Sequence, residues 1–542
     1  MKLCEYIDCC LTKLGVEKIF GIPGSLVMPI WQNLNDKEII LCSHEQEASY
    51  VATGYAKMSK KPVCVITTGG PGVTNCVSGI VAANIDSIPL IYISGRTPVS
   101  RKGYGERQEE SSINRLYDSI VILNGVTKKS VCIDDISNAP DIIWNVMRKA
   151  IEARQGAVHI SIPVDLQNQE LTYKISNFEI QTVTYHETSL DIAKRPIFIM
   201  GWGAWMSESY KKIYELAEKV KAPVLVTSKA YCCINANNKM YLGKLGYGYN
   251  SVIDDFIKEY NPNMILAFGS SLGSKDIKNT AVEHLLNEIP TFLIADDCSY
   301  ISHRNSNIVG CEVQNMTNFV NNLLESTGNR DEDIELYEKI LEARVRAIDY
   351  WSDKIIISDI MARCIRLIDY LCDEKCVVSA DAGNNLANAS VLINPTSPGH
   401  MFIDVGLRAM GTGICTAVGM AIADNKNKYV SITGDGCMLM NGNVMHVASE
   451  LRLPIVFIVF NNQSLGRVRV GQSIMNDYRA TDIKNVDYVI YAKTFGLITY
   501  KCFDMLEFEK AFIECLADSK PALIEVITDN DEIPVTVKDN IY

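Results

Sequence analysis

The sequence predicts an α/β protein of three domains, each an open, mostly parallel sheet flanked by helices. The chain has 542 residues, which exceeds what one hydrophobic core normally holds. Short apolar runs alternate with helical segments along nearly the whole chain, as parallel sheets require. Residues 48–69 and 416–434 share one order of features, namely a helix, a basic turn, a strand and a glycine. This similarity predicts two related sheets, whose ligands would bind at the carboxyl ends of the strands.

The first domain is predicted to span residues 1–170. Its helix at 48–58 leads into a strand at 63–69, and a buried strand at 156–165, stopped by a proline, closes the domain. The polar stretch 167–193 is predicted to be a linker.

Residues 190–328 are predicted to form the central domain. Its strands share short runs of Val, Ile, Leu and Phe, at 195–201, 224–227, 264–268 and 291–295. The turn 201–204 lacks the third glycine of a dinucleotide fingerprint, so we do not assign it to nucleotide binding. A charged helical stretch at 329–352 leads to the third domain, predicted at 355–535.

Two polar groups follow neighbouring apolar strands in the third domain. Asp435 stands between two glycines after one strand, and Asn462 follows Asn461 after the next. Parallel strands would bring Asp435 and Asn462 to the same edge of the sheet. Oxygen ligands suit Mg²⁺, which keeps part of its shell for phosphate oxygens. Because Gly436 allows close approach and the next helix offers free N–H groups to an anion, the pattern predicts a diphosphate–metal site.

Composition argues against several classes of protein. The formal charge of −12 argues against nucleic-acid binding, which normally needs a basic face. No apolar run reaches the roughly 18 residues that span a bilayer. Residues 1–6 begin no long secretory signal, so we expect a cytoplasmic protein without membrane contact. The eighteen cysteines include no Cys-x-x-Cys pair, so we expect reduced, mostly buried thiols rather than zinc ligands.

Three motifs carry a resemblance to a known family. They are the Gly-Asp-Gly and Asn-Asn pair above, His-Glu-Gln-Glu-Ala at 44–48, and Thr-Thr-Gly-Gly-Pro-Gly-Val-Thr-Asn at 67–75. Together they resemble motifs of the thiamine diphosphate (ThDP) enzymes of the acetohydroxyacid synthase (acetolactate synthase) and 2-keto acid decarboxylase family. The likeness covers nearly the whole chain, strongly in the first and last thirds and loosely in the middle. It implies ThDP and Mg²⁺ as cofactors.

The resemblance also implies roles near the reactive end of the cofactor. Glu45 would share a proton with N1′ of the aminopyrimidine, whereas Glu47 lies outside the motif; the alternative for Glu45 is a helix-capping role. Met410 would wedge between the two rings, with ordinary core packing as its alternative. The backbone carbonyl of Arg408 would accept the 4′-amino group. Gln108 would polarise a carbonyl or hydroxyl group of the substrate.

The same resemblance assigns the ligands of the diphosphate and the metal. Asn384 and Asn385 would donate amide hydrogens to phosphate. Asp435, Asn462 and the backbone carbonyl of Ser464 would bind Mg²⁺. The other cofactor-binding residues that it implies are Gly434, Gly436, Cys437, Leu465 and Gly466.

The substrate pocket departs from the family pattern at three arginines. Arg107 replaces a phenylalanine, Arg467 replaces a methionine, and Arg408 stands where the family often has glycine. These arginines favour a substrate more anionic than pyruvate, but exposed surface arginines explain them equally well. Lys128 or Lys129 stands near the family's lysine position.

The sequence weighs against FAD as an additional cofactor without settling the question. The family's FAD pocket includes an arginine in a turn of the central domain, and that arginine is missing from residues 268–276. Residues 241–248 do resemble a flavin-side loop.

We expect an enzyme that decarboxylates a 2-keto acid and joins the product carbanion to an acceptor carbonyl. The alternatives are a non-ligating 2-keto acid decarboxylase, a 2-hydroxyacyl-CoA lyase and, more distantly, a non-catalytic ThDP-binding paralogue. Decarboxylases that protonate their intermediate often use a histidine pair, and none of the seven histidines is adjacent to another. The resemblance further implies a homo-oligomer in which the first domain of one subunit faces the third domain of its neighbour, with the sites at that dimer interface.

Overall fold

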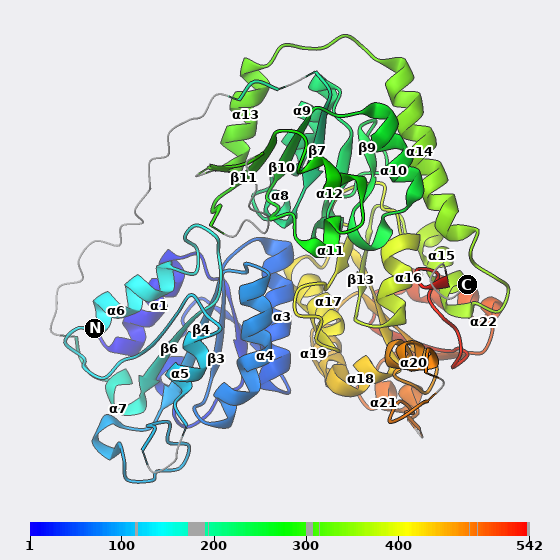
Figure 1. Cartoon of the computed structure of the whole chain (residues 1–542). Coiled ribbons are helices and arrows are strands. Elements are labelled where there is room, and N and C mark those ends of the chain that lie inside the picture. Colours follow the sequence, from blue (N-terminus) through cyan, green and yellow to red (C-terminus); the bar gives the residue numbers. More distant parts are fainter. Residues whose placement is uncertain are drawn as a thin grey trace.

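The computed structural model of the protein describes residues 1–113, 117–171, 190–192, 194–299, 307–313, 315–475, 477–484 and 486–538. These residues form three six-stranded sheets with helices on their faces, and every strand pairing is parallel (Figure 1). The predicted fold class is therefore confirmed. The residue limits of the domains stay predictions, and most of the predicted linker 167–193 lies outside the described residues.

The first sheet has the strand order β2-β1-β3-β4-β6-β5. Its strands are β1 (Lys18–Gly21), β2 (Glu38–Leu41), β3 (Val63–Thr67), β4 (Leu90–Arg96), β5 (Lys129–Cys132) and β6 (Val158–Pro163). Its helices are α1 (Leu3–Lys13), α2 (Met28–Trp31), α3 (Glu45–Ser59), α4 (Pro71–Ile85), η1 (Val99–Arg101), α5 (Ser119–Asn124), α6 (Ala139–Arg148) and α7 (Val164–Gln167). The strand predicted at 156–165 ends at Pro163, where α7 begins.

The second sheet has the order β12-β11-β10-β7-β8-β9. Its strands are β7 (Pro196–Met200), β8 (Val224–Val226), β9 (Tyr241–Lys244), β10 (Met264–Phe268), β11 (Thr291–Ala295) and β12 (Ile308–Glu312). Its helices are α8 (Trp202–Met206), α9 (Tyr210–Val220), η2 (Ser228–Cys233), η3 (Gly246–Gly248), α10 (Ser251–Tyr260), α11 (Ser274–Ile277), α12 (Ala281–Leu285) and α13 (Met316–Ser326). The long helix α14 (Ile334–Ser352) runs from this domain down to the third (Figure 1).

The third sheet has the order β14-β13-β15-β16-β18-β17. Its strands are β13 (Cys376–Ala380), β14 (Met401–Ile403), β15 (Lys428–Gly434), β16 (Ile455–Asn461), β17 (Ile498–Cys502) and β18 (Ala522–Ile527). Its helices are α15 (Ile360–Leu371), α16 (Asn384–Leu392), α17 (Thr412–Ala423), α18 (Asp435–Asn441), η4 (Gly442–Val444), α19 (Met445–Glu450), α20 (Gly466–Ser473), α21 (Tyr488–Lys493) and α22 (Met505–Ala517). Strand for strand, this order repeats that of the first sheet, as expected for two related sheets.

Helices α3 and α17 join the first and third domains (Figure 1). Each helix contributes a glycine at the crossing. A Cβ atom on Gly54 would overlap the carbonyl oxygen of Thr416, and one on Gly419 would overlap the carbonyl oxygen of Val51. The two backbones therefore touch, which fixes the distance between the domains.

A group of charges joins the first and central domains. Asp86, just after α4, pairs with Lys57 of α3 at 2.8 Å and with Lys229 of η2 at 2.9 Å. Both Asp86 and Lys57 are buried. Buried ion pairs need close partners to offset the loss of hydration, so these contacts favour one arrangement of the domains.

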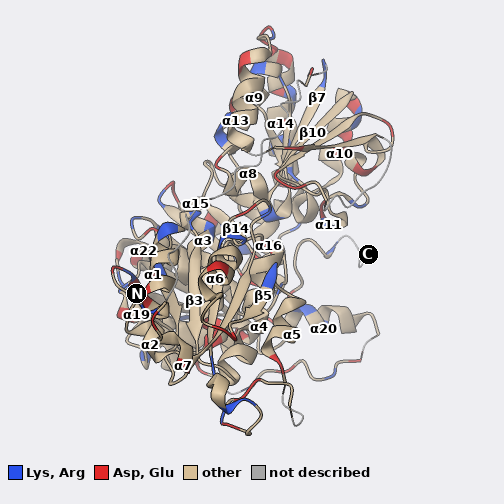
Figure 2. Ribbon diagram, turned by 90° about the vertical axis from the view of Figure 1, so that its left-hand side faces the viewer, with Lys and Arg blue, Asp and Glu red and all other residues tan. Residues whose placement is uncertain are grey.

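Charged residues elsewhere are dispersed. Blue and red segments alternate over all three domains in Figure 2. None of the described helices is long and apolar enough to cross a bilayer.

Candidate active site

Asp435 lies buried at the carboxyl edge of the third sheet, where β15 ends and α18 begins. Its Oδ1 accepts the N–H of Gly436 at 2.7 Å and its Oδ2 accepts the N–H of Ser464 at 3.1 Å. Burial raises the pKa of Asp435 to about 6, although these N–H groups act in the opposite direction. An ionised carboxylate here would gain much from a bound cation, because burial has removed its water.

The loop after β16 lies beside Asp435. The N–H of Ser464 is shared between Asp435 and the Oδ1 of Asn462, which accepts it at 3.2 Å. Asn461 supports this loop, because its amide donates to Glu525 at 2.6 Å and its Oδ1 accepts the N–H of Gln463 at 3.1 Å. The structure thus brings together the three residues for which we predicted metal binding.

The donor set suits Mg²⁺ and a diphosphate. Within the described residues, no three His, Cys, Asp or Glu side chains cluster so that they could hold a metal ion. A cation beside Asp435 would therefore need amide and carbonyl oxygens of the loop together with oxygens of its ligand, as a Mg²⁺–diphosphate pair provides.

Asn384 is available to bind a phosphate group. It is buried at the start of α16, yet neither atom of its amide group has a hydrogen-bond partner. Its Nδ2 would lie 2.9 Å from a Cβ atom on Gly466, and the Nδ2 of Asn462 would lie 2.8 Å from the same atom. Two amide groups therefore converge where Gly466 leaves room, which suits phosphate oxygens.

Asn385 is oriented differently from Asn384. Its Nδ2 donates to the carbonyl oxygens of Asp381 at 2.8 Å and Ile432 at 3.3 Å. Both amide hydrogens are thus engaged with the main chain, and a contact with phosphate would need its side chain to turn. The role predicted for Asn385 stays a prediction.

Met410 extends toward the turn that carries Asp435. Its Cε would lie 2.9 Å from a Cβ atom on Gly436, and Leu465 approaches the same point at 2.8 Å. The backbone directly after Met410 is held by Asp381, whose Oδ1 accepts the N–H of Gly411 at 3.2 Å. Cys437 is buried, and its thiol donates to the carbonyl oxygen of Ala382 at 3.2 Å.

Glu45 is the first residue of α3, but it does not cap the helix. The capping group is the Nδ1 of His44, which accepts the N–H of Gln46 at 3.1 Å. Glu45 instead accepts a hydrogen bond from Asn75 at 2.9 Å, and its backbone carbonyl accepts the thiol of Cys76 at 3.4 Å. The side chain is partly exposed, so it is available to a ligand.

The neighbouring carboxyl group of Glu47 has a structural role. It is fully buried and accepts the N–H of Ser43 at 3.0 Å. Burial raises its pKa to about 7. Glu47 therefore closes the start of α3 and leaves Glu45 free.

The predicted substrate residues are spread over three places. Gln108 is half-buried in a left-handed conformation, with φ of 64°, and accepts the hydroxyl of Thr68 at 3.3 Å. Arg107 and Arg467 are exposed. Arg408 is also exposed, but its guanidinium lies over the ring of Tyr247.

Lys128, one of the two lysines near the family's lysine position, makes local hydrogen bonds within the first domain. Lys128 donates to the carbonyl oxygens of Glu152 at 3.2 Å and Ala153 at 3.3 Å, within the first domain. Lys129 begins β5 and is exposed. No contact connects either lysine with Asp435 or Asn462 among the hydrogen bonds and ion pairs of the described residues.

The central sheet gives no support for a dinucleotide site. Its strand order changes direction between β7 and β10, where such sheets bind ligands. Here the loops after the two strands bond to each other, since Gly201 donates to Phe268 at 2.8 Å and Gly203 donates to Gly269 at 3.0 Å. The backbone itself occupies this position.

Several supporting residues were missed by sequence reasoning. Asp381 holds the backbone directly after Met410, Asn75 donates to Glu45, Glu525 accepts from Asn461, and the hydroxyl of Tyr488 donates to the carbonyl oxygen of Asp435 at 2.9 Å. Glu525 alone left a signal, because it is an acid inside the otherwise apolar strand β18.

Three family models match the chain in succession. The N-terminal TPP binding domain of thiamine pyrophosphate enzymes matches residues 1–116, the central domain matches residues 188–291, and the C-terminal TPP binding domain matches residues 381–526. Each of the three sheets thus falls largely within its own match.

Curated relatives match over nearly their whole length. A probable acetolactate synthase large subunit of Methanococcus aeolicus is 25% identical, over 95% of this chain and 90% of its own. The acetolactate synthase of Bacillus subtilis is 25% identical, over 99% and 94%, respectively. The acetolactate synthase isozyme 2 large subunit of Escherichia coli is 26% identical, over 97% and 96%.

A solved structure shares the fold. The thiamine diphosphate-dependent 4-hydroxybenzoylformate decarboxylase of Rhodococcus jostii superposes with a TM-score of 0.82, covering 98% of this chain and 100% of its own. Its sequence identity is 18%, so the likeness concerns the arrangement of the three domains and not the substrate.

Proposed function

The chain is a ThDP-dependent carboligase or decarboxylase of the acetohydroxyacid synthase and 2-keto acid decarboxylase family, and from this premise we propose that it is an acetolactate synthase-like carboligase. It would decarboxylate a 2-keto acid such as pyruvate and join the two-carbon unit to an acceptor carbonyl. The observation that carries the proposal is the meeting of Asp435, Asn462 and Ser464 beside the unpartnered amide of Asn384.

The residues at this edge would hold the cofactor. Asp435, Asn462 and the carbonyl of Ser464 would bind Mg²⁺, and Asn384 would donate to the diphosphate. When bound, ThDP supplies a carbon nucleophile and accepts the electron pair released with carbon dioxide. We propose no FAD, because the loops at the switch point of the central sheet bond to each other.

Glu45 would control a proton at the far end of the cofactor. Its carboxyl group is free of the capping role, which His44 fills, and Asn75 fixes its orientation. A carboxyl group in this position can share a proton with a ring nitrogen of the aminopyrimidine. Gln108 would orient the substrate carbonyl, and Met410 would contact the cofactor beside Gly436.

Carboligation is favoured over the alternatives by two observations. The curated relatives above are acetolactate synthases, and two histidines of this chain are engaged in structure: His44 caps α3, and buried His159 lies between Ser94 at 2.9 Å and Ser130 at 2.8 Å. A non-ligating decarboxylase or a 2-hydroxyacyl-CoA lyase stays the second candidate. Product analysis separates them: pyruvate alone should yield acetolactate, and pyruvate with an added aldehyde should yield a mixed acyloin. Acetaldehyde as the sole product in both reactions would contradict carboligation.

We further propose a homodimer, or a dimer of dimers, with the sites at the interface. In its support, Glu45 is bonded only within the first domain and Asp435 only within the third, among the contacts of the described residues. Mixing inactive Glu45→Gln and Asp435→Ala subunits should restore part of the activity, because each mixed dimer has one undamaged site. No recovery, with mixed dimers verified by native mass spectrometry, would place each site within one chain.

A reducing, cytoplasmic location is proposed as well. All eighteen cysteines are free, and burial raises the thiol pKa of several of them, for example Cys64 and Cys415. Such thiols resist oxidation because the thiolate is the reactive form. Fluorescence microscopy of a tagged copy in the source cell would test the location.

A further inference from the structure

Arg408 has a conformation that needs an explanation. Its φ is 60°, in the left-handed region that side chains other than glycine rarely adopt. It does not end a helix, because it lies in the segment between β14 and α17. Strained backbone of this kind is concentrated at ligand sites, where the surrounding structure holds it.

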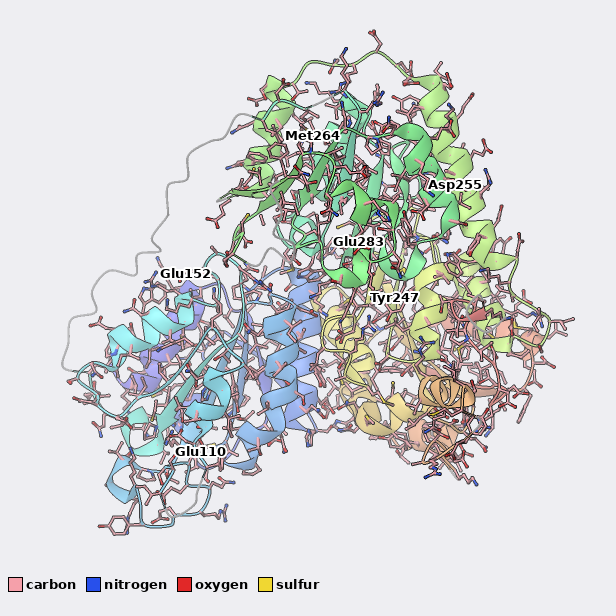
Figure 3. The ribbon with its side chains drawn as sticks, in the orientation of Figure 1. Glu110, Glu152, Tyr247, Asp255, Met264 and Glu283 are labelled. Atoms are coloured by element: carbon pink, nitrogen blue, oxygen red, sulfur yellow. The ribbon has the colours of Figure 1, made fainter. Side chains whose placement is uncertain are left out.

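The side chain of Arg408 is held against the central domain. Its guanidinium carbon lies 5.0 Å from the centre of the Tyr247 ring, a cation–π contact. Tyr247 belongs to η3, and Figure 3 shows it at the lower edge of the central domain, facing the helices of the third. A guanidinium that lies over an aromatic ring keeps N–H groups available for hydrogen bonds.

Positive charge is concentrated around this contact. Lys275 of α11 is exposed, and its pKa is lowered by partial burial and by the neighbouring charges of Arg408 and Lys229. Lys229 is neutralised by Asp86 at 2.9 Å. Asp276 is the acid on the same helix, and its Oδ1 is engaged by the N–H of Ser228 at 2.8 Å. Among the ion pairs of the described residues, none involves Arg408 or Lys275, in a chain whose net charge is −12.

Arg408 is also close to the predicted reaction centre along the chain. Two residues later, Met410 reaches the glycine turn beside Asp435. Arg107 and Arg467 are exposed and have no comparable aromatic contact among those of the described residues. Of the three arginines that depart from the family pattern, Arg408 is therefore the one whose side chain is held by an aromatic contact.

We propose that Arg408, assisted by Lys275, binds a second anionic group of the substrate, a carboxylate or a phosphoryl group distant from the reacting carbonyl. This inference rests on the proposed function, because it assigns the substrate class of the same site. A guanidinium suits both groups, since its two parallel N–H bonds match their oxygens.

Two pairs of compounds that differ in one charged group test the proposal. As donors, 2-oxoglutarate carries a second carboxylate that 2-oxopentanoate lacks. As acceptors with pyruvate as donor, glyceraldehyde 3-phosphate carries a phosphoryl group that glyceraldehyde lacks. In at least one pair the charged compound should have the higher kcat/KM, by about tenfold to a hundredfold, as expected for charge-assisted hydrogen bonds. The pair that shows the preference identifies the anionic group.

Arg408→Gly is the decisive variant. Glycine adopts the same left-handed backbone without strain and keeps the carbonyl group, so folding and ThDP binding should be preserved. In the variant, the ratio of kcat/KM for the charged compound to kcat/KM for the uncharged one should fall to about one, whatever the level of activity that remains. Lys275→Gln should lose part of the preference. A wild-type enzyme without a preference in either pair, or an Arg408→Gly variant that retains it, would overturn the proposal.

Two matched controls come from the same chain. Arg452 is exposed and left-handed, with φ of 50°, but follows α19, where this conformation ends a helix. Arg452→Gly and Lys278→Gln, the latter an exposed lysine just after α11, should leave the preference unchanged. A loss of preference in either control would show a general charge effect and contradict a specific site.

Calorimetry separates this proposal from the proposed function. 2-Oxoglutarate and glyceraldehyde 3-phosphate would be titrated into enzyme loaded with ThDP and Mg²⁺. Binding that depends on Arg408 without turnover of any 2-keto acid would overturn the proposed reaction and support the anion site. Turnover of pyruvate without such binding or preference would leave the reaction standing and overturn the anion site.

Discussion

The first and third sheets have one topology and opposite contents at their carboxyl edges. In the third sheet, β16 ends at Asn461, and the edge presents the buried carboxylate of Asp435. In the first sheet, the equivalent strand β4 ends at Arg96, which is buried and donates to the carbonyl oxygen of Glu110. The first sheet thus has a positively charged arginine at this edge, whereas the third sheet has a carboxylate that can bind a metal ion.

Glu110 completes the internal arrangement in the first sheet. It accepts the N–H of Gly70 and lies 3.2 Å from the hydroxyl of Tyr117, which also donates to the carbonyl oxygen of Gly70 at 2.8 Å. Figure 3 shows Glu110 at the base of the first domain. The Oε1 of Glu110 thus has partners within the protein, whereas neither atom of the Asn384 amide in the third domain has one. The comparison teaches that the same fold can fill a strand edge or leave it for a ligand, depending on a few residues.

The largest effect is expected from substitution of Asp435, the carboxylate that is predicted to bind Mg²⁺. Asp435→Ala removes the one carboxylate of the predicted metal site, so retention of ThDP should be abolished, with affinity lower by at least about a hundredfold. Isothermal titration with ThDP and Mg²⁺ measures this. Unchanged affinity would mean that the third sheet does not bind the cofactor at this edge.

Substitution of Glu45 tests the contribution of the first domain, which is predicted to be activation of the cofactor. Glu45→Gln preserves shape and the contact with Asn75 but cannot share a proton, so turnover should fall by about 10²- to 10⁴-fold while ThDP still binds. Exchange of the cofactor's C2 proton for deuterium is the direct assay. If exchange stays as fast as in the wild type, Glu45 is not the activating acid.

Substitution of Arg96 tests the structural role of the arginine at the edge of the first sheet. Arg96→Gln leaves the carbonyl of Glu110 and the nearby Asp118 without their charged partner, and stability should fall by about 1–3 kcal/mol. ThDP affinity should change little, because the diphosphate is predicted to bind at the third sheet. Urea unfolding and calorimetry of one preparation measure both. A large loss of affinity without a loss of stability would reverse the roles assigned to the two edges.

The smallest effect concerns pH. In the cofactor-free protein, the pKa of Asp435 is raised from 3.8 to about 6, so its contribution to stability is present below pH 4 and is lost as the pH rises toward 6. Mg²⁺ binds the ionised form, so the gain in melting temperature from ThDP and Mg²⁺ should increase between about pH 5 and pH 7. Asp435→Asn should lack this increase. The same increase in that variant would assign it to another group.

The sequence predicted the fold class and the third-sheet edge because both depend on local patterns. Apolar runs mark strands, and polar residues directly after them must lie at strand ends. It did not distinguish Asn384 from Asn385, because adjacent residues at a helix start point in different directions that only the packing decides. Asp381 and Glu525 were missed for a related reason: each acts on a loop that is distant in sequence. Arg96 was not singled out because a basic residue at a strand end does not reveal that its partners come from the segment that follows.

The crossing of α3 and α17 constrains how such a protein can change over evolutionary time. Gly54 and Gly419 each lie against the backbone of the opposite helix, so a methyl group gained at either position has no space. The equivalent strands β4 and β16, in contrast, end at Arg96 and Asn461 in two sheets that have the same strand order. Substitutions at the strand edges can therefore alter the chemistry of each domain, whereas a side chain added at the helix crossing would force the two domains apart.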